Sequence, residues 1–160
     1  MNSSHTISEP LPDAGHVIDV NEYSLEGLKI MLVDDSKTIL RSAEMYLAEK
    51  GCEVIMAEDG FQALTMIAQN RPDIIFMDIM MPKLDGYQAC ALIKSNEEYA
   101  DIPVVMLSSK HNLFDKARGR LSGSEEYLTK PFTHDDLIKA IATQLENAKH
   151  CEEDLLPEFI

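Results

Sequence analysis

The stretch Asp73-Ile74-Ile75-Phe76-Met77-Asp78, which runs on into Ile79-Met80-Met81-Pro82, decides the fold. The four apolar residues before Asp78 form a short run that loop residues and a proline close, a pattern typical of a strand buried in the core. Asp78 then stands at the carboxyl end of a core strand. Because ligands bind outside the carboxyl ends of the strands in an open α/β sheet, this position makes Asp78 a candidate functional residue.

Polar side chains follow three further predicted strands in the same way. Each has an ordinary alternative explanation, because an Asp after a strand often caps the next helix, a Ser often lies in a turn, and a Lys before Pro is often a surface residue. Their occurrence after four strands of one sheet favours a common function over four separate coincidences. The three strands and the residues after them are 29–33 with Asp34, Asp35 and Ser36; 102–107 with Ser108, Ser109 and Lys110; and 126–129 with Lys130 and Pro131.

Helical patterns alternate with the strands, and one more strand is predicted over 52–57. Five strand–helix units in succession predict an α/β fold class, with a mainly parallel sheet that helices cover on both faces. The predicted helices are 36–50, ended by Gly51; 61–70; a segment capped by Asp85; a weak helix around 112–118; and a last helix opened by Thr133 and Asp136, which resemble a capping box.

The length and composition fit one globular domain with two acidic ends. The chain has 160 residues, a net charge of −14 and 45% hydrophobic residues. Residues 1–27 hold five acidic side chains and no Lys or Arg, so we expect a flexible acidic N-terminal tail there. The domain is then expected over 28–149, followed by an acidic C-terminal tail over 150–160.

Charge and cysteine content disfavour several classes of function. An acidic chain is repelled by a phosphate backbone, so nucleic acid is not an expected partner. No apolar stretch reaches the ~20 residues of a membrane span, and no signal peptide is recognised, so membrane insertion is not expected. The three cysteines, Cys52, Cys90 and Cys151, are widely spaced, which indicates reduced thiols and a cytoplasmic location.

The acidic residues at the strand ends predict a cation site with phosphoryl chemistry. Asp34, Asp35 and Asp78 would repel one another unless a cation joined them, and oxygen ligands of this kind suit Mg²⁺. A carboxylate beside such an ion can attack a phosphoryl group and form an aspartyl phosphate. Phosphoryl transfer also needs positive charge and hydrogen-bond donors on the phosphoryl oxygens, which Lys130 and Ser108 can supply.

Four sequence motifs together resemble the CheY-like receiver domain of two-component response regulators, and the similarity extends from about Gly27 to Lys149. The resemblance implies a flavodoxin-like (βα)5 doubly wound sandwich with a parallel five-stranded sheet of order 2-1-3-4-5. The motifs are Leu32-Val33-Asp34-Asp35-Ser36, Met77-Asp78-Ile79-Met80-Met81-Pro82 with Asp85-Gly86, Val105-Met106-Leu107-Ser108-Ser109, and Tyr127-Leu128-Thr129-Lys130-Pro131-Phe132.

The resemblance also implies a role for each site residue. Asp78 would be the phosphoacceptor, stabilised by Lys130 and Ser108, and the Lys130–Pro131 bond would be cis. Mg²⁺ would be held directly by Asp35, Asp78 and the main-chain carbonyl of Met80, with Asp34 acting through a water. The switch residues would be Ser108 and Tyr127, and Met80 and Lys110 would tune the lifetime of the phosphoryl group.

The implied function is that of a stand-alone phospho-receiver that controls protein contacts. Within the family, the segments 60–64, 78–88, 90–94, 107–110 and 113–117 are most similar to regulators of the chemotaxis-like system of type IV pili and twitching motility. This similarity implies a CheA-type histidine kinase as phosphodonor. The output partner, a pilus-motor or other regulatory protein, would bind the face of the fourth helix, fifth strand and fifth helix. The chain would be no enzyme beyond its own phosphorylation and dephosphorylation.

Other functions remain as alternatives at this stage. The output could be that of a flagellar chemotaxis regulator, or the domain could bind partners without phosphorylation. A flavoprotein would want a Ser-, Thr- or Gly-rich phosphate loop after the first strand, where this chain has Asp34 and Asp35. A phosphatase of the haloacid dehalogenase type would carry Asp-x-Asp at the first strand. Both enzyme alternatives therefore fit the sequence less well.

Overall fold

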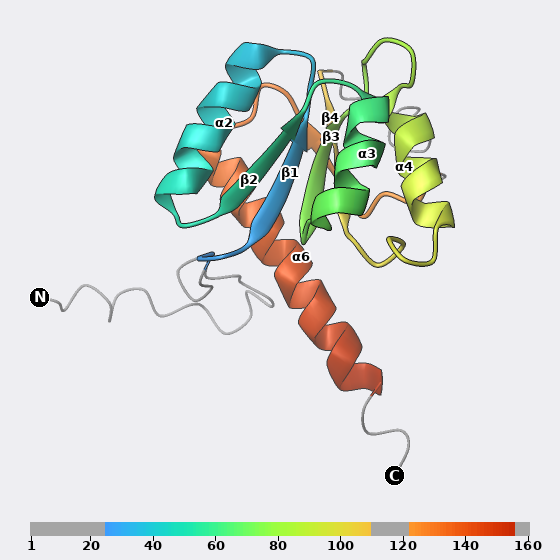
Figure 1. Cartoon of the computed structure of the whole chain (residues 1–160). Helices are drawn as coiled ribbons and strands as arrows, with labels where there is room; N and C mark the ends of the chain where they lie inside the picture. Colours follow the sequence, from blue (N-terminus) through green and yellow to red (C-terminus); the bar gives the residue numbers. More distant parts are fainter. Residues whose placement is uncertain (1–24, 110–121, 156–160) are drawn as a thin grey trace, which may run out of the picture.

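In the computed structural model, the described residues are 25–109 and 122–155, and within 149–155 only the backbone is described. Strands and helices alternate over most of this range (Figure 1). In chain order they are β1 (Lys29–Val33), α2 (Lys37–Glu49), β2 (Glu53–Ala57), α3 (Gly60–Asn70), β3 (Ile74–Asp78), α4 (Gly86–Ser95), β4 (Val104–Ser108), β5 (Glu126–Thr129) and α6 (His134–Leu155).

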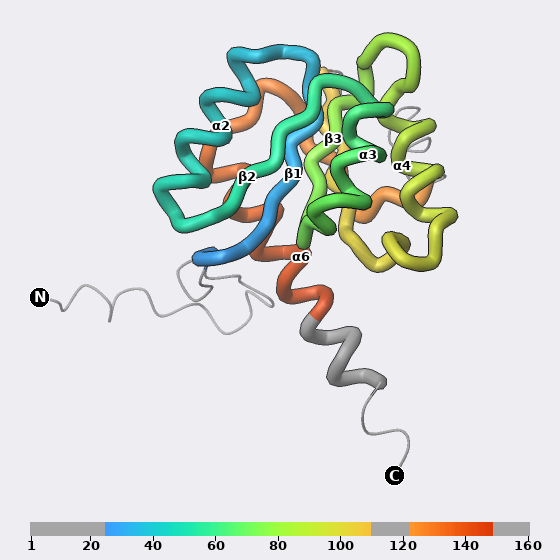
Figure 2. Tube along the Cα trace, in the orientation of Figure 1, coloured from blue at the N-terminus to red at the C-terminus, as the bar shows by residue number. Residues whose placement is uncertain are grey.

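The five strands form one parallel sheet in the order β2-β1-β3-β4-β5. This confirms the predicted fold class and strand order. Both neighbours of β1 come later in the chain, and the order reverses between β1 and β3, so those two strands mark the topological switch point. The tube in Figure 2 shows β1 and β3 side by side in the middle of the sheet.

Helices cover both faces of the sheet, with α3 and α4 on one side and α2 and α6 on the other (Figure 1). The two faces follow the alternation of side chains along each strand. In β1, Met31 and Val33 point to the α3/α4 side, whereas Ile30 and Leu32 point to the α2/α6 side. β3 and β4 are buried along their whole length, as expected for central parallel strands.

Hydrogen bonds confirm the helix starts predicted at Ser36, Asp85 and Thr133, and they add a cap at Asp59 that was not predicted. Ser36 and Asp59 accept bonds from main-chain N–H groups in the first turns of α2 and α3. Asp85 and Gln88 form a reciprocal capping box at α4. Thr133 and Asp136 form another before α6, with each side chain bonded to the main-chain N–H of the other.

One predicted helix lies outside the described residues, and one predicted tail is partly helical. The weak helix predicted at 112–118 lies outside the described residues, as do residues 1–24 and 156–160. The helix α6 continues to Leu155, so residues 150–155, predicted as part of an acidic tail, are helical in their backbone. No helix within the described ranges is long and apolar enough to cross a membrane.

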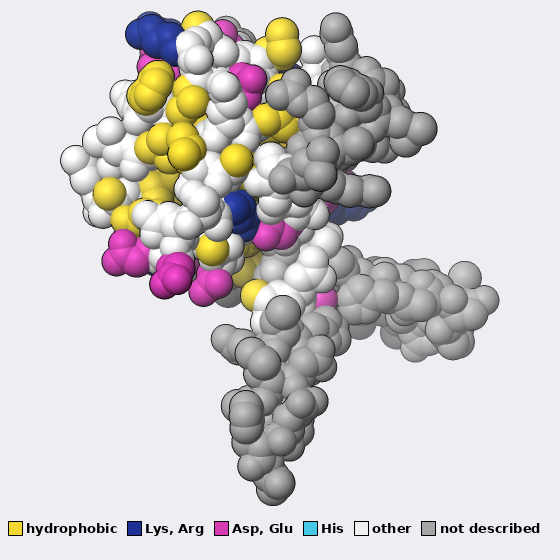
Figure 3. Space-filling model, turned by 90° about the vertical axis from the view of Figure 1, so that its right-hand side faces the viewer, with side chains coloured by type: hydrophobic (Ala, Val, Ile, Leu, Met, Phe, Trp, Pro, Cys, Tyr) yellow, Lys and Arg dark blue, Asp and Glu magenta, His cyan; other side chains and the backbone are white. Residues whose placement is uncertain are grey.

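The face of the molecule on the side of α4 carries hydrophobic side chains among polar ones (Figure 3). Figure 3 shows the side of the molecule where α4 lies, with hydrophobic side chains interspersed among other types. Among the described residues, Phe61 on α3 and Leu92 on α4 are the large exposed hydrophobic residues of this helix layer. Single exposed hydrophobic residues are common on protein surfaces and identify no interface by themselves.

Candidate functional site

Four strands deliver polar side chains to one edge of the sheet. Asp34 follows β1, Asp78 ends β3, Ser108 ends β4, and Lys130 follows β5. The strands are parallel and in register, with Asp78 opposite Leu107 and Ser108 opposite Thr129. The carboxyl ends of these strands therefore meet, and Asp34, Asp78, Ser108 and Lys130 lie at one edge of the sheet.

The site contains three carboxylates with very different exposure. One oxygen from each of Asp34, Asp35 and Asp78 lies within 4.8 Å of the others. Asp34 and Asp78 are only 1% and 4% exposed, whereas Asp35 is exposed to solvent. Asp34 Oδ1 also accepts the main-chain N–H of Ser36 at 2.9 Å, which fixes the carboxylate at the start of the loop before α2.

Lys130 bridges the two buried carboxylates. Its Nζ lies 2.7 Å from Asp34 Oδ2 and 3.2 Å from Asp78 Oδ1. The lysine side chain is itself only 16% exposed, so all three charged groups are largely removed from water. Two buried acids and one lysine leave an excess of negative charge, which Asp35 increases.

This arrangement shifts two pKa values upward. Burial and, second, the charge of Asp34 raise the pKa of Asp78 to about 6, although Lys130 and the main-chain N–H of Met80 oppose the shift. Burial lowers the pKa of Lys130, but the hydrogen bond with Asp34 and the charges of both acids outweigh it, so the net pKa is raised. Lys130 therefore remains a cation while Asp78 ionises near neutral pH.

The raised pKa of Asp78 predicts that its ionisation destabilises the fold. In the unfolded chain Asp78 loses its proton near pH 4, whereas in the native state it keeps it up to about pH 6. Between these values the native state binds more protons, so stability falls as pH rises and stays lower above pH 6. We expect Asp78→Asn, which is always neutral, to be more stable than wild type by about 1–3 kcal/mol at pH 7.

Urea unfolding of both proteins at pH 4, 5, 6 and 7, without divalent cations, measures this difference. The difference in free energy of unfolding between Asp78→Asn and wild type should be small at pH 4 and should increase up to pH 7. A gap that stays constant over this range would contradict the assigned pKa shift.

The loop after β3 packs tightly on the main chain of Asp78. Gly86 donates its main-chain N–H to Ile79 O at 3.0 Å. A Cβ atom at Gly86 would collide with the carbonyl oxygen of Asp78 and would lie 2.8 Å from Ile79 Cα. Only glycine therefore allows α4 to begin this close to the end of β3.

The close contact of Gly86 with the main chain of Asp78 and Ile79 predicts that Gly86→Ala destabilises the protein. Main-chain atoms of Asp78 and Ile79 must move to admit the methyl group, so we expect a loss of about 2 kcal/mol in the free energy of unfolding. Gly27→Ala is the matched control, because nothing lies within 4 Å of its Cβ position and only its φ of 81° is unfavourable. We expect that variant to lose about 1 kcal/mol, from its backbone conformation alone. Equal losses in urea unfolding would refute the steric role of Gly86.

The remaining predicted site residues have distinct environments. Ser108 is 3% exposed, and its carbonyl accepts the main-chain N–H of Lys130 at 2.6 Å. Tyr127 is half-buried on β5 and packs against the core on the α3/α4 side. The side chain of Met80 is 67% exposed at the rim of the site. Lys110 lies outside the described residues.

The acidic cluster fits a hard divalent cation. The three clustered carboxylates supply oxygen donors, and a pKa of about 6 leaves Asp78 ionised and available at neutral pH. Lys130 offsets part of the negative charge of Asp34 and Asp78. The exposed Asp35 forms no ion pair within the described residues, so its charge is available to a bound cation. The three carboxylates that the sequence predicted as cation ligands therefore lie close enough together to share one cation.

Two features of the site were not predicted from the sequence. The direct ion pair between Lys130 and Asp34 joins residues nearly a hundred positions apart, so no local sequence pattern predicts it. The contact of Gly86 with the main chain of Asp78 was not predicted either, although Asp85-Gly86 was part of a quoted motif. The predicted cis bond between Lys130 and Pro131 is present.

Comparison with known proteins assigns this geometry to one family. The family model described as "response regulator receiver domain" matches residues 30–142. Protein PilG of Pseudomonas aeruginosa is 60% identical over 120 residues, which covers 75% of this chain and 89% of PilG. Response regulator MprA of Mycobacterium leprae is 34% identical over 122 residues, and the match spans 76% of this chain but only 53% of MprA.

A solved structure supports the same assignment. The chemotaxis response regulator CheY4 of Vibrio cholerae has a TM-score of 0.71 and 30% sequence identity, and the match covers 74% of this chain and 98% of CheY4. The similarity therefore extends over the sheet and over the strand ends that form the site.

Proposed function

The chain belongs to the response regulator receiver domain family, and on this basis we propose that it is a phospho-receiver that accepts a phosphoryl group on Asp78. The observation that carries the proposal is the bridge of Lys130 between Asp34 and Asp78 at the carboxyl ends of the strands. The bridge holds a cation beside a carboxylate that ionises near neutral pH. Such a carboxylate can act as a nucleophile towards phosphorus.

In the proposed reaction, a carboxylate oxygen of Asp78 forms a bond to phosphorus while the bond from phosphorus to the donor breaks. The donor keeps the electron pair of that bond. The Lys130 ammonium, 3.2 Å from Asp78 Oδ1, opposes the negative charge of the transferring oxygens. The Ser108 hydroxyl, at the end of the neighbouring strand, is proposed to donate a hydrogen bond to one of them.

We propose Mg²⁺ as the cation of the acidic cluster. Asp35, Asp78 and the main-chain carbonyl of Met80 would bind it directly, and Asp34 would act through a water. When bound, the ion supplies positive charge to the phosphoryl oxygens and to the crowded carboxylates. Lys130 and Ser108 would complete the charge balance on the remaining oxygens.

The role of Asp35 in cation binding leads to a prediction. Asp35 is the exposed member of the cluster, so Asp35→Ala removes a ligand without leaving a cavity in the core. We expect its Mg²⁺ affinity to fall at least about tenfold, as for loss of a metal ligand or its close partner. Isothermal or fluorescence titration measures it, with Asp135→Asn, an exposed acid on α6, as control. An unchanged affinity in Asp35→Ala would remove Asp35 from the ligand set.

The 60% identity to PilG supports the proposed signalling context, the control of type IV pili and twitching motility. A CheA-type histidine kinase would be the phosphodonor in the cytoplasm. Phosphorylation would bias an equilibrium between two conformations, with Ser108 and Tyr127 as switch residues and Met80 and Lys110 setting the lifetime. The output partner would bind the surface of β5, α6 and the helix predicted at 112–118.

Phosphoryl uptake from acetyl phosphate tests the proposed function. Incubation with acetyl phosphate and Mg²⁺ should add about 80 Da to the intact mass. A chelator should suppress the gain. A binding module that works without phosphorylation would show no gain under either condition, and that result would replace the proposal with this alternative.

A flagellar chemotaxis output remains the alternative for the signalling context, and CheY4 of Vibrio cholerae supports the shared fold.

A further inference from the structure

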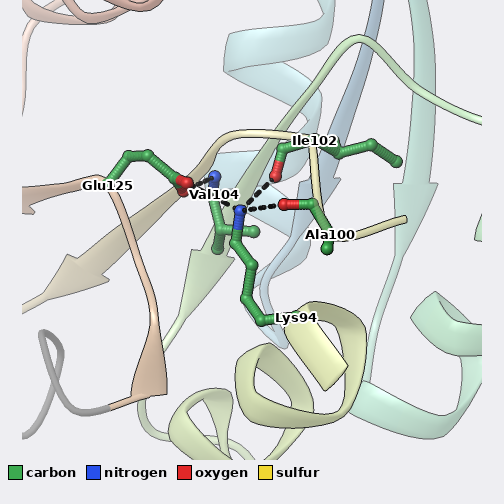
Figure 4. Close-up of polar contacts among 5 residues, drawn as sticks. All are labelled: Lys94, Ala100, Ile102, Val104 and Glu125. Atoms are coloured by element: carbon green, nitrogen blue, oxygen red, sulfur yellow. Dashed lines mark hydrogen bonds and ion pairs between the residues drawn. The ribbon is translucent and has the colours of Figure 1, made fainter. Parts of the chain in front are cut away.

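A second charged cluster lies at the opposite, amino-terminal end of β4 and β5 (Figure 4). Lys94, near the end of α4, has a side chain that is only 13% exposed. Its Nζ donates hydrogen bonds to Ala100 O at 3.0 Å and Ile102 O at 2.6 Å, and it pairs with Glu125 Oε2 at 2.7 Å. Three oxygen atoms therefore surround a nearly buried ammonium group that has no part in the phosphoryl site.

Glu125 joins this ammonium group to the edge of the sheet. Its second carboxylate oxygen, Oε1, accepts the main-chain N–H of Val104 at 2.8 Å (Figure 4). Its own main-chain N–H donates to Val104 O at 2.9 Å. Val104 is the first residue of β4 and Glu125 directly precedes β5, so the side chain adds one bond to the start of the β4–β5 ladder.

The chain just before Glu125 also lies against α4. A Cβ atom at Gly123, which has a φ of 96°, would lie 2.9 Å from Lys94 Cγ. Ser122 forms a side-chain hydrogen bond with the buried Cys90, one turn before Lys94. The entry into β5 is therefore held on α4 over several consecutive residues.

The strand that follows needs such an anchor. β5 has only four residues, each half-buried, and it is an edge strand that pairs with β4 alone. A slip of one residue would shift it by ~3.3 Å and turn every side chain to the opposite face. Lys130 follows β5 directly, and its contacts of 2.7 and 3.2 Å with Asp34 and Asp78 would not survive that shift.

We propose that Lys94 and Glu125 form a register pin for β5, and that both are positioning residues for Lys130. The bond from Val104 N–H to the Glu125 carboxylate forms in one register only, and Lys94 holds the carboxylate in the orientation that makes it. The inference rests on the proposed function for the role of Lys130 in phosphoryl transfer. The pin itself concerns only the placement of the strand.

Hydrogen exchange at the far end of β5 tests the pin. The Lys130 amide bonds to Ser108 O, well beyond the cluster along the strand. In Lys94→Met and Glu125→Gln we expect this amide to exchange at least about tenfold faster than in wild type, because the strand opens as a unit. Lys139→Met is the matched control, since Lys139 pairs with Asp135 on the surface, where both side chains are 68% exposed. It should change exchange by less than about twofold.

Phosphoryl uptake provides the second readout. At saturating Mg²⁺ we expect both variants to react with acetyl phosphate at least about tenfold more slowly, because misplacing a stabilising group by about 1 Å is costly. Their Mg²⁺ affinity should equal that of wild type, since Asp34, Asp35 and Asp78 do not lie on β5. A merely local structural role would leave the uptake rate unchanged.

The outcomes separate this inference from the proposed function. Faster exchange at Val104 alone, with the Lys130 amide and the uptake rate as in wild type, would overturn the pin. Wild-type protein that takes up no phosphoryl group would overturn the proposed function, and the exchange readout would still decide on the pin. If Lys94→Met does not fold, Glu125→Gln carries both readouts. Its effect should be smaller than that of Lys94→Met, because the amide oxygen can still accept the Val104 N–H, but it should still reach about tenfold. A smaller effect than that, or none, would overturn the pin.

Discussion

Asp78→Asn will gain no mass on incubation with acetyl phosphate and Mg²⁺, whereas wild-type protein will gain about 80 Da. The amide keeps the shape of the side chain but lacks the carboxylate that attacks phosphorus. Asp78 is 4% exposed at the end of a fully buried strand, and we expect neither Asp34 nor Asp35, whose oxygens lie within 4.8 Å, to accept the phosphoryl group in its place. Intact-mass measurement of both proteins, over the same time course, gives the comparison.

The control for this variant is another Asp→Asn change far from the site. Asp135 is on the surface of α6, and Asp135→Asn should take up phosphoryl groups like wild type. The expected gain in stability of Asp78→Asn removes misfolding as an explanation of its inactivity. A full mass gain in Asp78→Asn would show that another group accepts the phosphoryl group.

Lys130→Met will slow phosphoryl uptake by about 100-fold, the usual cost of removing one electrostatic stabiliser of a transition state. The same change leaves Asp34 and Asp78 buried without their shared cation. We therefore expect the free energy of unfolding to fall by about 3 kcal/mol at pH 7, as for a broken buried ion pair. Uptake rates and urea unfolding measure the two effects independently.

The pH dependence distinguishes this effect from a general loss of packing. Lys130 lowers the pKa of Asp78, so its removal should move that pKa further above 6. Protonation of Asp78 removes one of the two uncompensated charges, and the stability loss should therefore shrink as pH falls to 5. Lys139→Met, with its exposed ion pair, should match wild type in rate and stability. A loss from Lys130→Met that is independent of pH would contradict the electrostatic explanation.

The sequence was sufficient to predict the strands and the polar residues that meet at their carboxyl ends, for reasons that are local or topological. The run Ile74–Met77 is apolar and short, so β3 could be predicted as a buried strand. Parallel strands bring their carboxyl ends to one edge, which places Asp34, Asp78, Ser108 and Lys130 together without any knowledge of their contacts. The strand order itself came from the family resemblance.

The contacts between these side chains depend on distances that no sequence pattern contains. Spacing along the chain does not reveal that Lys130 reaches Asp34 at 2.7 Å as well as Asp78. The same holds for Lys94 and Glu125, which are 31 residues apart and lie on different elements. The end of α6 was also missed, because the acidic residues 152–154 suggested a tail although Glu, which fills two of these positions, is a good helix former.

Locating the phosphoryl group on the chain tests the central claim most directly. Borohydride reduces an aspartyl phosphate to homoserine, and peptide mass mapping then identifies the modified position. After reaction with acetyl phosphate and Mg²⁺, we predict homoserine at position 78 and unmodified Asp34 and Asp35. Homoserine at either of those two residues, or at no residue of a protein that has gained mass, would contradict the assignment of Asp78 as the phosphoacceptor.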